Sequence, residues 1–139
     1  MFEAKRKGKI QIILTSMGDI GDRDDLMRQY LLQAKANVNQ LRRQGWRGNV
    51  QYRPYTEDGP VREKGSQPRA ATLFEIPELV EFAARPDHHV VLIARRCGLC
   101  GATHERALEP LLTKPRLRVF SELVTDSATA RALLKAPRK

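Results

Sequence analysis

Two glycine-containing loops carry most of the side chains in this 139-residue chain that could do chemistry. One follows a strand-like segment at 9–15 and the other a strand-like segment at 89–94. Ligands of open α/β sheets bind outside the carboxyl ends of the strands, so we expect the two loops to meet around one ligand. The candidate ligand-binding residues are Ser16, Gly18, Asp19, Gly21 and Asp22 in the first loop and Arg95, Arg96, Gly101 and Thr103 in the second.

The first loop could present backbone N–H groups to an anion at the start of the helix that follows it. Its carboxylates, Asp19 and Asp22, favour contacts with hydroxyl or ribose groups rather than with phosphate. The alternative is a tight turn whose polar residues cap the helix. The sequence leaves both interpretations open.

The second loop runs from Arg95 to Glu105, with Gly101 four residues before the glutamate and a helix predicted to begin there. This spacing, together with the alternation of strands and helices along the chain, resembles the nucleoside 2-deoxyribosyltransferase family and its TIR-like relatives. The resemblance implies that Glu105 is a catalytic nucleophile, which would attack the anomeric carbon of a nucleoside or dinucleotide and form a glycosyl ester. The structural alternative is that Glu105 only stabilises the first turn of a helix.

The same loop contains Cys97, Cys100 and His104, which are ligand types that zinc accepts. A fourth ligand would have to be His88 or His89, but the preceding strand would place either one about 20 Å away. This distance disfavours a zinc site, and we expect that the protein requires no metal or other cofactor. A redox pair is a second alternative, since a helix N-terminus would lower the pKa of the first thiol.

The chain is strongly basic, with 25 Lys and Arg against 16 Asp and Glu and a net charge of +9. That excess predicts attraction to nucleic acid, to nucleotide phosphates or to an acidic protein partner. The aromatic residues Trp46, Tyr52 and Tyr55 lie near the second of two basic clusters, and could stack on bases. The candidate nucleic-acid-binding residues are Lys5, Arg6, Lys7 and Lys9 in the first cluster and Arg42, Arg43 and Arg47 in the second.

Strand-like segments at 9–15, 49–53, 89–94 and 117–120 alternate with helical patterns, the clearest of which runs from Met27 to Leu41. This order predicts one α/β domain over 1–139: a flavodoxin-like parallel sheet of four or five strands in the order 2-1-3-4, with helices on both faces. Residues 1–8 form a basic arm in this prediction, and 54–70 form an exposed loop.

The longest apolar run, Val90 to Ala94, is far too short to span a membrane, and no secretory signal is recognisable. Two cysteines provide no disulfide framework, so we expect a cytoplasmic protein. The oligomeric state stays open.

The primary hypothesis is therefore a nucleotide- or nucleoside-binding domain, with hydrolysis or transfer of an N-glycosidic bond at Glu105. The alternative is a non-catalytic nucleic-acid-binding or assembly subunit that uses its basic surface.

Overall fold

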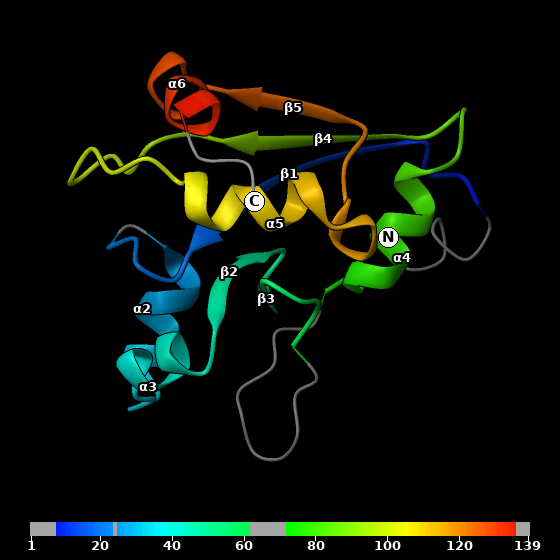
Figure 1. The fold of residues 1–139 in the computed structure, drawn as a ribbon. Coiled ribbons are helices and arrows are strands. Elements are labelled where there is room, and N and C mark those ends of the chain that lie inside the picture. Colours follow the sequence, from blue (N-terminus) through cyan, green and yellow to red (C-terminus); the bar gives the residue numbers. More distant parts are fainter. Residues whose placement is uncertain (1–7, 24, 62–71, 136–139) are drawn as a thin grey trace.

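The computed structural model describes residues 8–23, 25–61 and 72–135 (Figure 1). These residues form an α/β fold in which five strands make one sheet. The elements in chain order are β1 (Ile12–Asp19), α2 (Leu26–Gln33), α3 (Val38–Arg43), β2 (Trp46–Val50), β3 (Arg53–Thr56), α4 (Ile76–Ala83), β4 (His89–Ala94), α5 (Glu105–Thr113), the 3₁₀ turn η1 (Pro115–Leu117), β5 (Glu122–Thr125) and α6 (Ser127–Lys135).

The strand order is β3-β2-β1-β4-β5, with β4 parallel to both β1 and β5. The predicted α/β class is confirmed, as is the parallel pairing of the first strand with the strand at 89–94. The prediction of a wholly parallel sheet is wrong, because β2 pairs antiparallel with β1 and with β3. The last residue of β1, Asp19, lies opposite Gly48 in the middle of β2.

Strand β3 (Arg53–Thr56) has three of its four residues inside the segment predicted as an exposed loop at 54–70. Residues Arg53, Pro54 and Tyr55 are buried, and β3 pairs with β2 across a two-residue turn at Gln51 and Tyr52. Prolines misled the sequence prediction here, since Pro54 sits in a strand on the edge of the sheet, where a missing N–H is tolerated. Residues 62–71 of the predicted loop and 1–7 of the predicted basic arm lie outside the described residues.

The helix predicted from Met27 to Leu41 is two helices, α2 and α3. The chain breaks at Lys35, which adopts a positive φ of 57°, and Asn37 then caps α3 by accepting a hydrogen bond from the N–H of Gln40. Both helices bury apolar side chains in a small cluster of their own. The apolar spacing was read correctly as helical, but it continues through the turn and so concealed the break.

The final strand, β5, begins at Glu122 rather than at residue 117. Leu117 and Val119 are completely buried, but they pack from η1 and the segment after it. Their apolar character therefore reflects burial rather than strand pairing.

The main core lies between helices α4 and α5 and one face of the sheet (Figure 1). Val90 and Leu92 of β4 point into this core, where they pack with Leu79 of α4 and Leu108 of α5. The Tyr55 hydroxyl, also buried, donates a hydrogen bond to the backbone carbonyl of Ala107, 2.8 Å away. This face is called the covered face below.

The opposite side of β1, β4 and β5 is largely bare. Ile12, Leu14, Ile93 and Val124 define this open face, and their exposed fractions are 67%, 68%, 37% and 52%. Helices were predicted on both faces, but no helix in the described part of the chain packs over these four side chains. No helix in that part of the chain is long and apolar enough to cross a membrane either.

Candidate functional site

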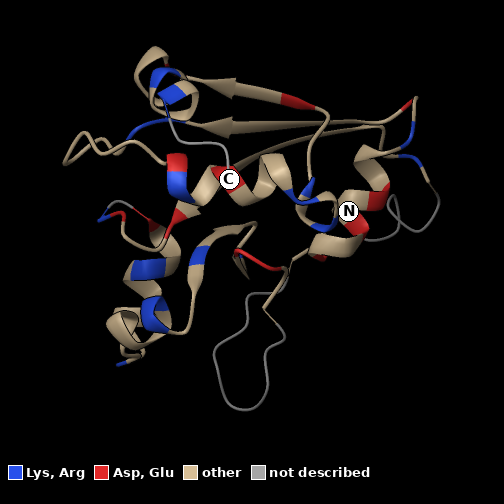
Figure 2. Cartoon of the chain, viewed as in Figure 1, with Lys and Arg blue, Asp and Glu red and all other residues tan. Residues whose placement is uncertain are grey.

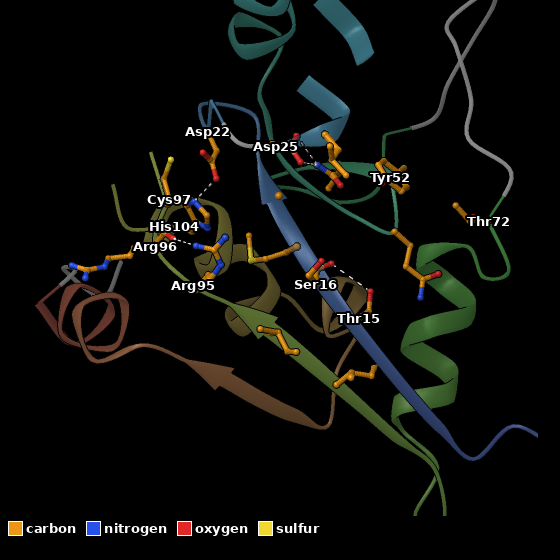
Figure 3. Close-up of a pocket in the computed structure, with 18 of the residues that line it drawn as sticks. Thr15, Ser16, Asp22, Asp25, Tyr52, Thr72, Arg95, Arg96, Cys97 and His104 are labelled. Carbon is orange, nitrogen blue, oxygen red and sulfur yellow. Dashed lines mark hydrogen bonds and ion pairs between the residues drawn. The ribbon is translucent and has the colours of Figure 1, made fainter. Parts of the chain in front are cut away.

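A cleft of about 710 Å³ lies at the carboxyl ends of β1 and β4, where it continues onto the open face (Figure 3). Leu14 and Ile93 of the open face are among the residues that line it. Tyr52 and Asp25 approach from one side and Arg95 from the other (Figure 3). The two predicted loops therefore do meet here. The predicted residues that line the cleft are Ser16, Gly18, Asp22, Arg95, Arg96, Cys97 and His104.

Other predicted site residues do not line this cleft. Asp19 folds back on its own loop, where its carboxylate accepts a hydrogen bond of 2.7 Å from the N–H of Gly21. Burial raises the pKa of Asp19. Gly101 has a positive φ of 71° and lies in the turn after Cys97. These contacts favour the turn-and-cap interpretation for Asp19 and Gly21.

Glu105 is the first residue of α5 and does not line the cleft. Its carboxylate accepts a hydrogen bond from the hydroxyl of Thr103, two residues earlier. This local contact, at the positive end of the helix dipole, is the structural role that the sequence offered as the alternative. The geometry gives no support to Glu105 as a nucleophile in the cleft.

A buried group of three side chains joins the two loops at one end of the cleft. His104 Nε2 lies 3.0 Å from Asp22 Oδ2, and both side chains are more than nine-tenths buried. The Cys97 thiol also hydrogen-bonds to Asp22, which raises the pKa of that thiol. Asp22 comes from the loop after β1, whereas Cys97 and His104 come from the loop after β4. The group therefore fixes the two loops relative to each other.

The redox hypothesis predicted a lowered pKa for Cys97, and that expectation is wrong, because its thiol donates to a carboxylate. Cys97 is buried and Cys100 exposed, and both are free cysteines. Among the described residues, no three His, Cys, Asp or Glu side chains are placed to hold a metal ion.

Asp25 and Asn49, which sequence reasoning did not select for the cleft, form its opposite end. The Asn49 amide donates to both Asp25 oxygens, at 3.2 and 3.1 Å, while Asp25 also caps α2 through the N–H of Arg28. Burial raises the pKa of Asp25. A Cβ at Gly18 would overlap the Asp25 carboxylate, so this arrangement requires glycine there.

Tyr52 is a third cleft residue in a role that the sequence did not reveal. It occupies the β2–β3 turn with Gln51, and the two residues have positive φ values of 59° and 50°. Two-residue hairpin turns of this kind strongly favour Asn-Gly or Asp-Gly, because side chains with a Cβ are strained in this region. Tyr52 nevertheless lines the cleft and is 43% exposed. Strain of this kind is often retained where a side chain serves a site.

Arg95 and Arg96 are exposed and come directly after β4. The backbone N–H of Arg96 donates to Asp126, and hydrogen bonds from the N–H groups of Thr129 and Arg96 lower the pKa of Asp126 to about 2. The segment is thereby tied to the start of α6. The backbone that carries the two arginines is thus fixed at the edge of the cleft.

The predicted nucleic-acid-binding residues that the structure describes do not line the cleft, while Lys5, Arg6 and Lys7 lie outside the described residues. Arg42 and Arg43 are exposed on α3, and Lys9 is exposed before β1. Arg47 pairs with Glu57 at 2.7 Å, so part of its charge is already matched. Trp46 and Tyr55 are buried, which rules out the predicted stacking of bases on these two rings. Lys and Arg are spread over several elements, with acidic residues between them (Figure 2).

No family model and no curated protein matches the chain. Its fold does match solved structures of bacterial transcriptional regulators, all of low sequence identity. The full-length sorbitol operon regulator SorC from Klebsiella pneumoniae aligns with a TM-score of 0.68 and 18% identity, over 96% of this chain and 39% of that one.

Two further regulators align in a similar way. A probable sor operon regulator from Shigella flexneri gives a TM-score of 0.57 and 18% identity, over 90% of this chain and 42% of that one. A transcriptional regulator from Streptococcus pneumoniae TIGR4 gives a TM-score of 0.61 and 15% identity, over 96% of this chain and 45% of that one. The chain therefore has the fold of one part of these regulators and spans about two fifths of their length.

These comparisons overturn the predicted resemblance to nucleoside 2-deoxyribosyltransferases and TIR-like proteins, and with it the hypothesis of a nucleotide-binding glycosidic hydrolase or transferase. A glycine four residues before a helix-opening glutamate is too short a pattern to distinguish these folds. The order of strands and helices, which seemed to support the resemblance, is shared by many α/β proteins.

Proposed function

We propose that this chain is the effector-binding part of a transcriptional regulator and that its cleft takes a small polar molecule. The observation that carries this proposal is the cleft at the carboxyl ends of β1 and β4, where parallel strands commonly bind ligands. The fold likeness to three regulators supports the regulatory context.

The lining favours a hydroxyl-rich molecule that carries an anionic group. Arg95 and Arg96 offer guanidinium donors, which suit a phosphate or carboxylate. The side-chain oxygen of Asn49 and the exposed hydroxyl of Ser16 can meet hydroxyl groups, since the Asn49 nitrogen is already bound to Asp25. The Tyr52 ring supplies a flat apolar surface for the carbon side of such a ligand.

The buried Asp22, His104 and Cys97 group is assigned a positioning role in this proposal. It holds the loop that carries Arg95 and Arg96 against the loop after β1. A site on loops needs this support, because loosely held side chains lose binding geometry.

DNA is the partner that a regulator requires, and the net charge of +9 supports contact with it. Because Lys and Arg are spread over several elements, we expect the described part of the chain to add electrostatic affinity rather than sequence-specific contacts. Binding to duplex DNA should then weaken steeply as salt rises, with little preference between sequences.

The effector proposal is tested by calorimetric titration with sorbitol, its phosphate monoester, glucose phosphate and inorganic phosphate. We expect a phosphorylated polyol or sugar to bind best and Arg95→Met to weaken it at least about tenfold, the worth of one charge-assisted contact. Arg131→Met, which removes an exposed arginine from α6, is the matched control and should leave binding unchanged.

Tyr52→Gly gives a sharper result because its two effects oppose each other. Glycine relieves the positive φ, so the variant should gain about 0.5 to 1 kcal/mol in stability after the entropy cost of glycine. The same change removes the ring from the cleft and should lower ligand affinity. The proposal would be contradicted if none of the four compounds bound. It would also be contradicted if one bound and neither Arg95→Met nor Tyr52→Gly altered its affinity.

A further inference from the structure

We propose that the open face of the sheet is a docking surface for a second copy of this chain, packed face to face with its strands antiparallel to the first. The proposal rests on the exposure of the face, on the pairing of its strands and on the charges at its two ends. It does not depend on which effector the cleft binds.

The open face is apolar over three adjacent strands. Leu14 of β1 lies beside Val91 of β4, and Ile93 of β4 lies beside Val124 of β5, so the side chains form one continuous patch. Leu14 is 68% exposed and Val124 is 52% exposed. A contiguous exposed patch of this kind in a soluble protein marks an interaction surface more often than isolated apolar residues do.

The pairing of these strands adds a second argument. Parallel sheets occur almost only with both faces covered, because their strands are apolar on both sides. Here β1, β4 and β5 are parallel to one another, yet the described helices cover one face only. The bare side therefore has the character of a surface that is buried in the functional assembly.

The charges favour one arrangement of two copies. Glu122 lies beside Val91 at the amino end of β5 and contacts His89 at 2.8 Å, whereas Arg95 follows the carboxyl end of β4. Antiparallel packing brings the Glu122 end of each copy toward the Arg95 end of the other. Parallel packing would place the two Arg95 ends together, and repulsion between their like charges would disfavour that arrangement.

The consequence reaches the cleft. Leu14 and Ile93 belong both to the open face and to the cleft lining. A second copy on the open face would therefore close the cleft from above and bring its own Glu122 and His89 near the opening. The cleft of a single copy is incomplete in this arrangement.

The test is sedimentation of the whole chain over a wide range of protein concentration. We expect a reversible dimer whose dissociation constant rises at least about tenfold in Leu14→Glu, because a charge would be buried in an apolar interface. Leu134→Glu is the matched control, since Leu134 is 81% exposed on α6 and away from the open face. It should dimerise like the wild type, and circular dichroism should show both variants folded.

A charge exchange tests the orientation. Glu122→Arg alone should weaken the dimer, and the double variant Glu122→Arg with Arg95→Glu should restore it. The proposal is overturned if the wild type stays monomeric at every concentration or if Leu14→Glu and Leu134→Glu behave alike. Failure of the double variant to recover association would overturn the antiparallel arrangement.

Discussion

The two faces of strands β1, β4 and β5 differ sharply in how far their apolar side chains are exposed. Leu92 of β4 is completely buried on the covered face, while Leu14 of the neighbouring β1 is 68% exposed on the open face. Leu92 lies in a strand that is apolar after His89, and Leu14 ends the apolar run Ile12–Leu14 at the start of β1. Such runs are typical of strands with two covered faces. The covered face contributes that apolar character to the core, whereas on the open face the apolar side chains stay exposed, and we propose that they contact a ligand or a second copy of the chain.

A matched pair of substitutions gives the largest expected difference between the faces. Leu92→Ala should lower the free energy of unfolding by about 2 to 5 kcal/mol, because it leaves a cavity in the core. Leu14→Ala should change it by less than about 0.5 kcal/mol, because the side chain is already exposed to water.

Chemical denaturation measures both values, at protein concentrations low enough to keep the chain monomeric. Equal losses in the two variants would mean that the open face is buried within a single copy, and the comparison of faces would fail.

Substitutions at two tyrosines should also differ in their effect on the free energy of unfolding, but by less than the two leucine substitutions do. Tyr55→Phe removes a buried hydroxyl that bonds to Ala107 on the covered side, and should cost about 1 kcal/mol. Tyr52→Phe changes an exposed ring beside the cleft and should be neutral within about 0.5 kcal/mol. Thermal unfolding of the two variants and of the wild type under the same conditions measures both changes in stability. A neutral Tyr55→Phe would show that this bond does not hold β3 against α5.

The sequence predicted the covered side of the fold better than the open side. Apolar runs located β1 and β4 and their parallel pairing, because burial in a sheet leaves a strong local pattern. The antiparallel β2–β3 hairpin was missed, since its turn residues Gln51 and Tyr52 carry no glycine or asparagine signal. Nor can any local pattern tell whether a second apolar face is covered.

The cleft was predicted in part for the same physical reason. Loops that follow neighbouring parallel strands must converge, so Ser16, Asp22 and Arg95 were found from strand positions alone. Asp25 and Asn49 meet across 24 residues of chain, and a contact of that separation depends on the tertiary fold. Glu105 was chosen from a short motif, and its contact with Thr103 is local.

An effect that depends on pH is expected just after β5, where the segment after β4 joins the start of α6. The pKa of Asp126 is lowered from 3.8 to about 2, so the folded chain binds fewer protons there than the unfolded chain. Its contribution to stability is therefore fully present above about pH 4 and is lost as the pH falls toward 2.

Asp126→Asn should lower the free energy of unfolding above about pH 4, where the carboxylate contributes, and should therefore flatten the decline in stability as the pH falls toward 2. Denaturation curves between pH 2 and 5 check this, with Asp58→Asn on the exposed segment after β3 as the control. Identical profiles for wild type and Asp126→Asn would remove the proposed tie between the Arg96 segment and α6.

The central claim, a ligand cleft at the carboxyl ends of β1 and β4, is tested most directly by mapping backbone amide chemical shifts during titration with the phosphate monoester of sorbitol. The account predicts saturable shifts concentrated at Ser16, Asn49, Tyr52 and Arg95, with α4 and the covered face unchanged. Saturable shifts confined to the exposed arginines of α3, or no saturable shift at all, would contradict it.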